Sequence, residues 1–242
     1  MFNYIWHTFF FDPVYNGLIF FITVIPGGDV GLAIICTTIL IKVVLLPLSI
    51  KAAKTQKIMR EIEPKLREIK EQYKDQREEQ ARQMMTIYKD AGMNPFSALF
   101  VFVLQIPLII ALYLSVYGYS GYALPAVNSD VLYAFLSVPQ EISMWFLGVV
   151  DMAGRSAVLA VLAGVTMYWQ MHMVMPAIKP REEGAAPDFK SDFARNMQMQ
   201  MKYVMPVIIV VVAYIISAAI ALYFVVSNVV AILQEFYIRR HR

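Results

Sequence analysis

The sequence has very few of the side chains that form disulfides or bind metal ions. Cys36 is its only cysteine, and its three histidines, His7, His172 and His241, lie far apart. One cysteine excludes a disulfide within the chain, and scattered histidines lack the close spacings of a metal site. No catalytic triad, phosphate-binding loop or pair of catalytic carboxylates stands out. The sequence therefore weighs against an enzyme, and we expect no cofactor and no bound metal.

Charged residues are also scarce. They make up 16% of the 242 residues, against 59% hydrophobic residues and a mean hydropathy of +0.55. This balance is typical of a polytopic membrane protein with a single membrane domain. Residues 1–29 contain no Lys or Arg, so they lack the basic start of a secretory signal or a transit peptide. That absence favours a bacterial plasma membrane over an organelle.

One ionisable residue interrupts the first long apolar run. Residues 30–50 are long enough to cross a hydrocarbon core about 30 Å thick, and Lys42 is their only charged residue. A lysine at the membrane centre costs roughly 3 kcal/mol and usually faces water or protein. Lys42 is also able to extend its stem towards the interface. Taken alone, Lys42 is explained equally well by a functional role and by a side chain that extends to the interface.

Lys and Arg gather in three segments, which the positive-inside rule places in the cytoplasm. The apolar tract between Lys202 and Arg239 would be about 54 Å long as one helix, so it must cross twice, with a break near Ser217 to Ala219. We therefore predict an all-α protein with five spans, the N-terminus outside and the C-terminus inside. The predicted order is an interfacial helix (12–26), span 1 (30–50), a cytoplasmic helical hairpin (51–92), span 2 (96–117), an outer loop (118–155), span 3 (156–175), a cytoplasmic loop (176–202), span 4 (203–219), span 5 (221–238) and a basic tail (239–242).

The first of these helices is predicted to start at Asp12-Pro13, a helix cap followed by a first-turn proline. Pro26-Gly27-Gly28 would end it after about 18 Å, too short to span. We therefore expect it to lie in the interface. A sixth span is the competing interpretation, but it would put an uncharged N-terminus inside.

Two apolar stripes predict that residues 51–92 fold as a helical hairpin with a turn at Lys74-Asp75-Gln76. Their basic surface suits either anionic lipid or ribosomal RNA, and salt would weaken both contacts. The first stripe is Ile58, Ile62, Leu66, Ile69 and Tyr73, and the second is Ala81, Met84, Met85 and Tyr88.

Three further features outside this hairpin have alternative interpretations. Gln105 in span 2 either joins helices or lines a polar path. Trp145 and Phe146 suit a membrane interface. Methionines crowd both sides of the 176–202 loop, where they either pack or contact varied apolar partners.

The order of these parts resembles the YidC/Oxa family of membrane protein insertases, from about Asp12 to Gln234. Each matching motif is weak alone, and the combination is specific. The motifs are Lys42 five residues before Pro47-Leu48, Glu63-Pro64-Lys65, Tyr73-Lys74-Asp75, Tyr88-Lys89 with Asn94-Pro95, Gln105-Ile106-Pro107, Phe146-Leu147-Gly148 with Asp151, and Leu222-Tyr223 with Ser227-Asn228 and Gln234.

The resemblance implies a five-helix bundle around a hydrophilic groove, open to the cytoplasm and to lipid and closed towards the outside. It implies nascent membrane proteins as clients, with or without the Sec translocon, the lipid bilayer as medium, and no DNA partner. The chain departs from the family in having Lys42 where arginine is usual, Ser97-Ala-Leu-Phe100 before the glutamine, and no proline near Ser217. The residues expected to line the groove are Lys42, Thr38, Gln105, Tyr223, Ser227 and Gln234, and those expected to matter in the hairpin are Pro64, Lys65, Tyr73, Lys74, Asp75 and Tyr88.

The expected mechanism is that Lys42 attracts acidic client residues while polar side chains keep water in the groove. Two other classes of protein would account for part of this sequence. A small transporter would explain the buried cation, but the spans have no carboxylate away from their ends to relay with, and no inverted repeat is evident. A membrane scaffold with a recruiting hairpin would leave Lys42 and Gln105 without a role.

Overall fold

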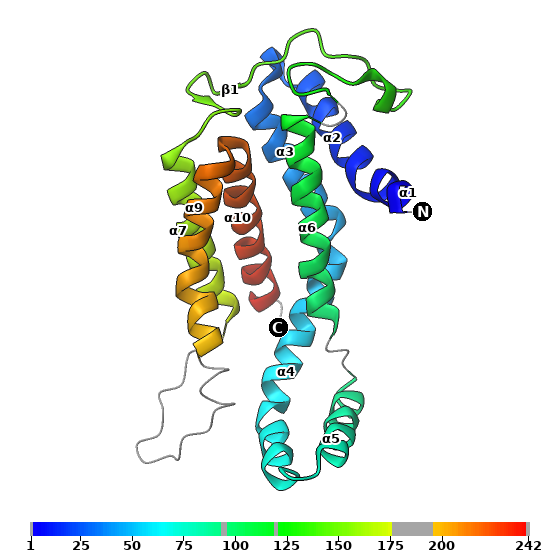
Figure 1. Ribbon diagram of the computed structural model, residues 1–242, viewed down its shortest axis with the longest axis vertical. Helices are drawn as coiled ribbons and strands as arrows, with labels where there is room; N and C mark the ends of the chain where they lie inside the picture. The colour runs from blue at the N-terminus through cyan, green and yellow to red at the C-terminus, as the bar shows by residue number, and fades with distance from the viewer. Residues whose placement is uncertain (1, 93–95, 119–120, 176–195, 241–242) are drawn as a thin grey trace. The chain divides into compact units, whose positions relative to one another are not determined.

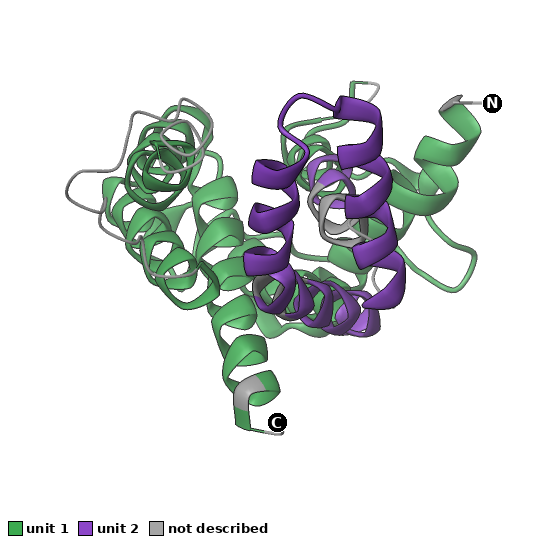
Figure 2. Cartoon of the chain, turned by 90° about the horizontal axis from the view of Figure 1, so that it is seen from below, with its two compact units in different colours: residues 1–42, 108–242 green, residues 43–107 purple. Residues whose placement is uncertain are grey.

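The computed structural model describes residues 2–92, 96–118, 121–175 and 196–240, and most of them are helical. The chain divides into two compact units, residues 1–42 with 108–242 and residues 43–107 (Figure 2). In chain order (Figure 1), the elements are α1 (Phe2–Trp6), η1 (His7–Phe11), α2 (Asp12–Val24), η2 (Pro26–Gly28), α3 (Val30–Val44), α4 (Leu46–Gln72), α5 (Arg77–Asp90), α6 (Phe96–Tyr117), η3 (Ser129–Val131), β1 (Trp145–Phe146), β2 (Val150–Asp151), α7 (Ala157–Val174), η4 (Gln200–Val204), α9 (Met205–Ile216) and α10 (Ala218–Arg240).

Three helices in the described ranges are long and apolar enough to cross a membrane: Ala157–Val174, Asn196–Ile216 and Ala218–Ile238. A fourth is added if Val30–Val44 and Leu46–Thr55 count as one broken span. A shorter apolar helix, Val103–Tyr117, lies within α6, the predicted second span. The protein is therefore a helical membrane protein, and the number five stays a prediction.

α7 packs against both α9 and α10. A Cβ at Gly164 of α7 would overlap Val210 of α9, so the glycine lets the two backbones approach closely. Asn228 of α10 donates from Nδ2 to Ala163 O and to Thr166 Oγ1 of α7, at 3.2 Å each. A small residue and a buried amide thus hold these helices together.

The chain breaks between α9 and α10 at Ser217, which is extended (φ −178°, ψ 165°). Ser217 Oγ accepts a hydrogen bond from Ile220 N at 3.2 Å, which caps the start of α10. The sequence placed the break between Ser217 and Ala219.

The N-terminal helix begins earlier than the sequence predicted. α1, η1 and α2 follow one another from Phe2 to Val24, and Asp12 has helical angles (φ −62°, ψ −44°). Asp12 is therefore not the helix cap that the sequence predicted, although α2 itself begins there. A π-helical turn just before Pro13 accommodates the ring and the missing N–H that would otherwise break a helix. The helix ends at Pro26-Gly27-Gly28, where both glycines have positive φ (76° and 60°).

The apolar run 30–50, predicted as one span, is interrupted at Leu45, between α3 and α4. Pro47 is the physical reason, because it has no N–H to bond the Val43 carbonyl and its ring crowds that oxygen. α4 then continues without a break through Lys51 to Gln72, so the predicted division between span and hairpin falls inside one helix.

Residues 121–155, called here the cap loop, contain the only strands in the described part of the chain. β1 and β2 form an antiparallel hairpin that pairs Trp145 with Asp151 and Phe146 with Val150. The prediction of an all-α protein missed this small sheet, because strands of two residues leave no periodic signal in the sequence.

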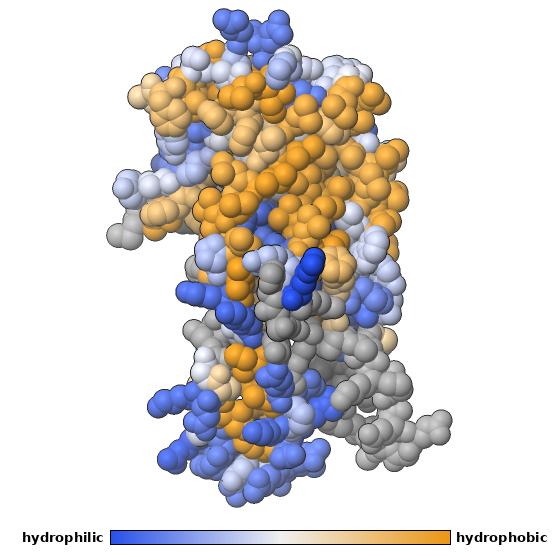
Figure 3. All heavy atoms as spheres, turned by 180° about the vertical axis from the view of Figure 1, so that it is seen from behind, coloured by the Kyte–Doolittle hydropathy of each residue, from blue (hydrophilic) through white to orange (hydrophobic). Residues whose placement is uncertain are grey.

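The second unit contains a helical hairpin of α4 and α5. Ile62 and Leu66 of α4 form its core, and partly buried residues from both helices pack against them. On the face shown in Figure 3, charged and polar side chains flank an apolar strip of this hairpin, whereas apolar side chains cover much of the other unit. The predicted second stripe is wrong at Ala81 and Met85, which are exposed, and its places are taken by Ile87 and Ala91.

Candidate functional site

The predicted cation lies in the last turn of α3, among apolar side chains. Lys42 is half-buried, while Ile39 and Val43 beside it are exposed. Thr38, one turn earlier on the same face, is buried, and its Oγ1 donates to Ile34 O at 2.6 Å. The local environment of Lys42 therefore combines apolar residues with one buried hydroxyl oxygen.

Thr37 is a buried polar residue that sequence analysis missed. It is 1% exposed, and its Oγ1 has no hydrogen-bond partner among the residues that the structure describes. Its methyl group faces α2, where a Cβ at Gly17 would lie 3.6 Å away. The pair Thr37-Thr38 could have signalled it, since two polar residues in succession are unusual in an apolar helix.

Of the polar residues predicted on α10, Tyr223 and Ser227 lie close together, and Gln234 lies further along the helix. Tyr223 and Ser227 are 3% and 7% exposed, and they lie one turn apart on the same face of the helix. Gln234 follows on the same face, half-buried and about 10 Å further along the helix at 1.5 Å per residue. Asn228 points instead at α7, so it holds helices together and belongs to a different face.

Gln105 lies in the part of α6 that belongs to the second compact unit and is half-buried. Lys42 belongs to the other unit, where it ends the segment of residues 1–42. A groove lined by both residues therefore stays a prediction.

The cap loop is tied to α2 by buried polar side chains. Asn16 is 2% exposed; its Nδ2 donates to Val131 O at 2.9 Å, and its Oδ1 accepts from Tyr133 N at 2.7 Å. Tyr15 Oη accepts from Asn128 N at 2.8 Å. Burial, and next the charge of Asp12, raise the pKa of Tyr133, so its phenol is neutral at pH 7.

A buried carboxylate ties the cap loop to α3. Asp29 is 8% exposed; its Oδ1 accepts from Leu32 N at 3.0 Å and its Oδ2 from Leu147 N at 2.7 Å. Asp29 therefore caps α3 and holds the turn of the β-hairpin at once. Beside it, Val30 N donates to Ser143 O at 3.0 Å.

The end of the cap loop is bonded to α6 and α10. Tyr117 donates from its hydroxyl to Ala153 O at 2.6 Å. Ala218 N donates to Gly154 O at 2.8 Å and Ala219 N to Met152 O at 3.2 Å. The cap loop thus joins the ends of α2, α3, α6 and α10, a role the sequence did not indicate.

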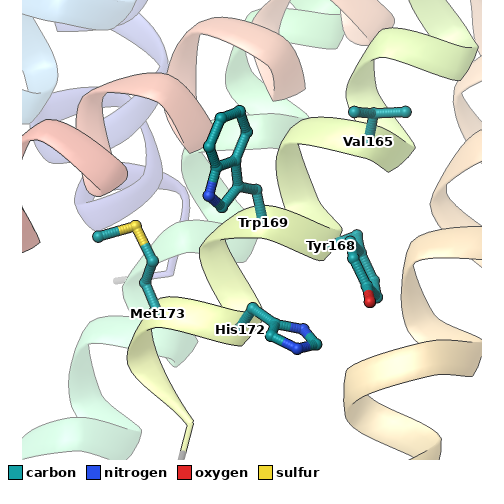
Figure 4. Close-up of a pocket in the computed structure, with 5 residues that line it drawn as sticks. All are labelled: Val165, Tyr168, Trp169, His172 and Met173. Carbon is teal, nitrogen blue, oxygen red and sulfur yellow. The ribbon is translucent and has the colours of Figure 1, made fainter.

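An apolar and aromatic stripe follows one side of α7. Figure 4 shows its five residues around a shallow hollow of about 460 Å³: Val165, Tyr168, Trp169, His172 and Met173. Tyr168 lies 4.8 Å from His172 and 6.1 Å from Tyr203, measured between ring centroids. This side of α7 offers apolar contact area together with a few polar atoms.

The predicted hairpin residues have different surroundings. Pro64 and Lys65 lie inside α4 and are exposed. Lys74 and Asp75 are exposed in the turn between α4 and α5. Tyr73 is half-buried at the end of α4, and Tyr88 packs against the Ile62–Leu66 core of the hairpin. Asn94-Pro95 and the loop 176–195 lie outside the described residues.

No cluster of three or more His, Cys, Asp or Glu that could hold a metal ion occurs within the described ranges. The candidate site consists of Lys42 and polar side chains on apolar helices, and the cap loop is bonded at the opposite end of α3 from Lys42.

Comparison with known proteins assigns the family. The family model described as "60Kd inner membrane protein" matches residues 21–242. The "Membrane protein insertase YidC" of Oceanobacillus iheyensis is 31% identical over 241 residues, which cover 98% of this chain and 84% of the relative. The "Membrane protein insertase YidC 2" of Bacillus anthracis is 32% identical, with coverage of 97% and 81%. The "Membrane protein insertase MisCA" of Bacillus subtilis is 30% identical, with coverage of 97% and 79%. The chain therefore belongs to the family of the 60Kd inner membrane protein, which includes the YidC membrane protein insertases.

Proposed function

We propose that this chain is a membrane protein insertase that helps client transmembrane segments enter and fold in a bacterial plasma membrane. The observation that carries the proposal is the match over nearly the whole chain to relatives named as insertases. The clients are nascent membrane proteins, and the chain acts alone or beside the Sec translocon. Lys42 adds a chemical reason, because an ionisable side chain half-buried in an apolar membrane helix usually serves a function.

The proposed topology has five spans, with α6 as the span that completes the count. α6 runs from Phe96 to Tyr117, about 33 Å at 1.5 Å per residue, and contains no charged residue. The cap loop has Arg155 as its only basic residue, whereas the α4–α5 hairpin is rich in Lys and Arg. By the positive-inside rule, the cap loop faces outside and the hairpin the cytoplasm.

The proposed chemistry is a wet half-channel that shortens the path of a client's polar tail. Thr38 and Lys42 on α3 face it, with Gln105 on α6, and Tyr223, Ser227 and Gln234 on α10 complete the lining. Lys42 attracts an acidic tail, and the hydroxyl and amide groups retain water that the hydrocarbon cannot supply. The apolar segment of the client then moves sideways into lipid.

The cap loop supports a path that is closed on the outer side. Its bonds to α2, α3, α6 and α10 leave the outer helix ends joined by backbone and buried polar groups. The stripe of α7 with Trp169 and Met173 supplies apolar contact for the client segment, because aromatic and thioether side chains adapt to varied partners.

The α4–α5 hairpin is proposed to meet the ribosome or anionic lipid at the cytoplasmic face. Lys65 and Lys74 are exposed and available for such contact, and Asp75 lies beside Lys74 in the turn. Binding through these residues should weaken with rising salt.

The test is insertion of a single-span client with an acidic outer tail into liposomes that contain only this protein. We expect protection of the tail from protease with the parent and with Lys42→Arg, and loss of most protection with Lys42→Ala. Arginine keeps the charge, whereas alanine removes it.

Lys51→Ala is the matched control, because Lys51 is exposed and lies outside the apolar run. It should insert the client as the parent does. Equal insertion by Lys42→Ala and the parent would disprove the role of the charge, and no insertion by any folded variant would disprove autonomous activity.

A further inference from the structure

The β1–β2 hairpin of the cap loop presents large apolar side chains at its turn. Trp145, Leu147 and Val149 are 55%, 64% and 75% exposed. Phe146 between them packs over α3, where a Cβ at Gly31 would overlap its ring. Single exposed apolar residues are ordinary, but a contiguous group on one protrusion indicates a contact surface.

The turn is held in an unfavourable backbone conformation. Leu147 has φ 50°, in the left-handed region that leucine rarely adopts, and Gly148 follows with φ 71°. The 2.7 Å bond from Leu147 N to the buried Asp29 carboxylate stabilises this conformation. The protein therefore fixes a leucine outward at a position where glycine or asparagine would be easier.

Both strands of the hairpin are anchored to helix ends. The β1 side is bonded through Ser143 to Val30 and Gly28, and the β2 side through Met152 to Ala219. These hydrogen bonds on both sides fix the position of the turn relative to the starts of α3 and α10.

The turn lies near the start of a helix that exposes apolar side chains. In Figure 1 the hairpin lies beside the start of α7, on the side away from α2. The first turns of α7 expose Val158 and Val161, at 71% and 52%. Arg155, one residue before the cap residue Ser156, is exposed as well.

We infer that the turn Trp145–Val149 inserts into the outer leaflet of the bilayer, with Leu147 and Val149 among the acyl chains. Trp145 lies at the level of the headgroups, where its ring and its N–H are both satisfied, and Arg155 meets lipid phosphate. The partner is lipid because the turn lies near the start of α7, which exposes apolar side chains and is long and apolar enough to cross a membrane. This inference rests on the proposed topology, and it assigns the hairpin the task of setting the depth of α7.

The test uses fluorescent labels in lipid vesicles that contain the protein without any client. In a Cys36→Ala background, Leu147→Cys carries an environment-sensitive fluorophore, and Gln140→Cys, an exposed polar position of the same loop, carries the same label as control. We expect quenchers attached to lipid acyl chains to act several-fold more strongly on the label at 147 than at 140. Aqueous iodide should show the opposite order.

Stronger quenching of position 147 by iodide, or protection from both quenchers, would overturn the inference, the latter because a protein surface would then cover the turn. Because no client is present, this result is independent of insertion activity. The companion variant is Leu147→Asn, which tolerates the left-handed conformation and removes the apolar group. With a label at Val149→Cys, it should reduce acyl-chain quenching several-fold without loss of the folded protein.

Discussion

Two segments of this chain lie outside its apolar helices, and different forces hold them. The cap loop is fixed by buried polar groups, Asn16 and Asp29, that bond to its backbone over 115 and 118 residues of sequence. The α4–α5 hairpin is fixed by a small apolar core around Ile62 and Leu66, and the charges on its surface are mostly exposed.

The difference has a physical consequence for each segment. Hydrogen bonds to buried groups are directional, and a lost partner leaves an unsatisfied group, so the cap loop has one well-defined geometry. Apolar contacts are not directional, and the hairpin core is small, so the hairpin opens at lower cost. In the proposed topology, the fixed cap would close the outer side, and the hairpin of lower stability would adapt to partners in the cytoplasm.

The largest expected effect comes from Asp29→Ala. The change leaves Leu32 N and Leu147 N without acceptors, and bonds to a charged group contribute about 1.5–3 kcal/mol each. We expect the free energy of opening of the cap loop to fall by about 3 kcal/mol, so amide exchange at Leu147 should rise by roughly 100-fold. Hydrogen exchange of the protein in detergent measures this.

Asp29→Asn is the matched control, because its side-chain oxygen still accepts one of the two bonds. It should lower the free energy of opening of the cap loop by about half as much as the alanine variant does. Unchanged exchange at Leu147 in Asp29→Ala would show that the carboxylate does not hold the turn.

A smaller effect is expected for Leu66→Ala in the hairpin core. Leu66 is 6% exposed, and truncation of a buried leucine costs about 2 kcal/mol or more. Exchange should rise in α5 and in the C-terminal half of α4, while the cap loop stays protected. Met85→Ala is the control, because Met85 is 61% exposed and its loss should change exchange little. A rise in exchange at the cap loop would contradict the independence of the two segments.

The apolar helices could be predicted from the sequence, and their interruptions only in part. Long apolar runs between polar segments leave α7 and α10 few alternatives in a membrane. Pro47 signals the break at Leu45, because proline removes a helical hydrogen bond, although residues 30–50 were predicted as one span. The π-helical turn before Pro13 left no signal, because the same residues form an ordinary helix start equally well.

The site was less predictable, since it depends on contacts between distant residues. Spacing placed Tyr223 and Ser227 on one face of α10, and the structure buries both side chains. No local pattern connects Asn16 with Tyr133 or Asp29 with Leu147, so one sequence alone could not indicate the cap. In the hairpin, Met85 and Ile87 fit a helical stripe almost equally, and only the packing of α5 on α4 decided between them.

The smallest expected effect tests whether surface charge contributes to the hairpin fold. On α4, Arg67 Nη2 lies 2.7 Å from Glu63 Oε1, and the two side chains are 63% and 51% exposed. A pair so exposed contributes about 0.5 kcal/mol or less, because water screens the attraction and both side chains lose freedom. Arg67→Ala should therefore leave exchange in α5 nearly unchanged, in contrast to Leu66→Ala at the adjacent position. If both variants opened the hairpin equally, charge pairing would be as important there as the apolar core, and the contrast with the cap loop would no longer hold.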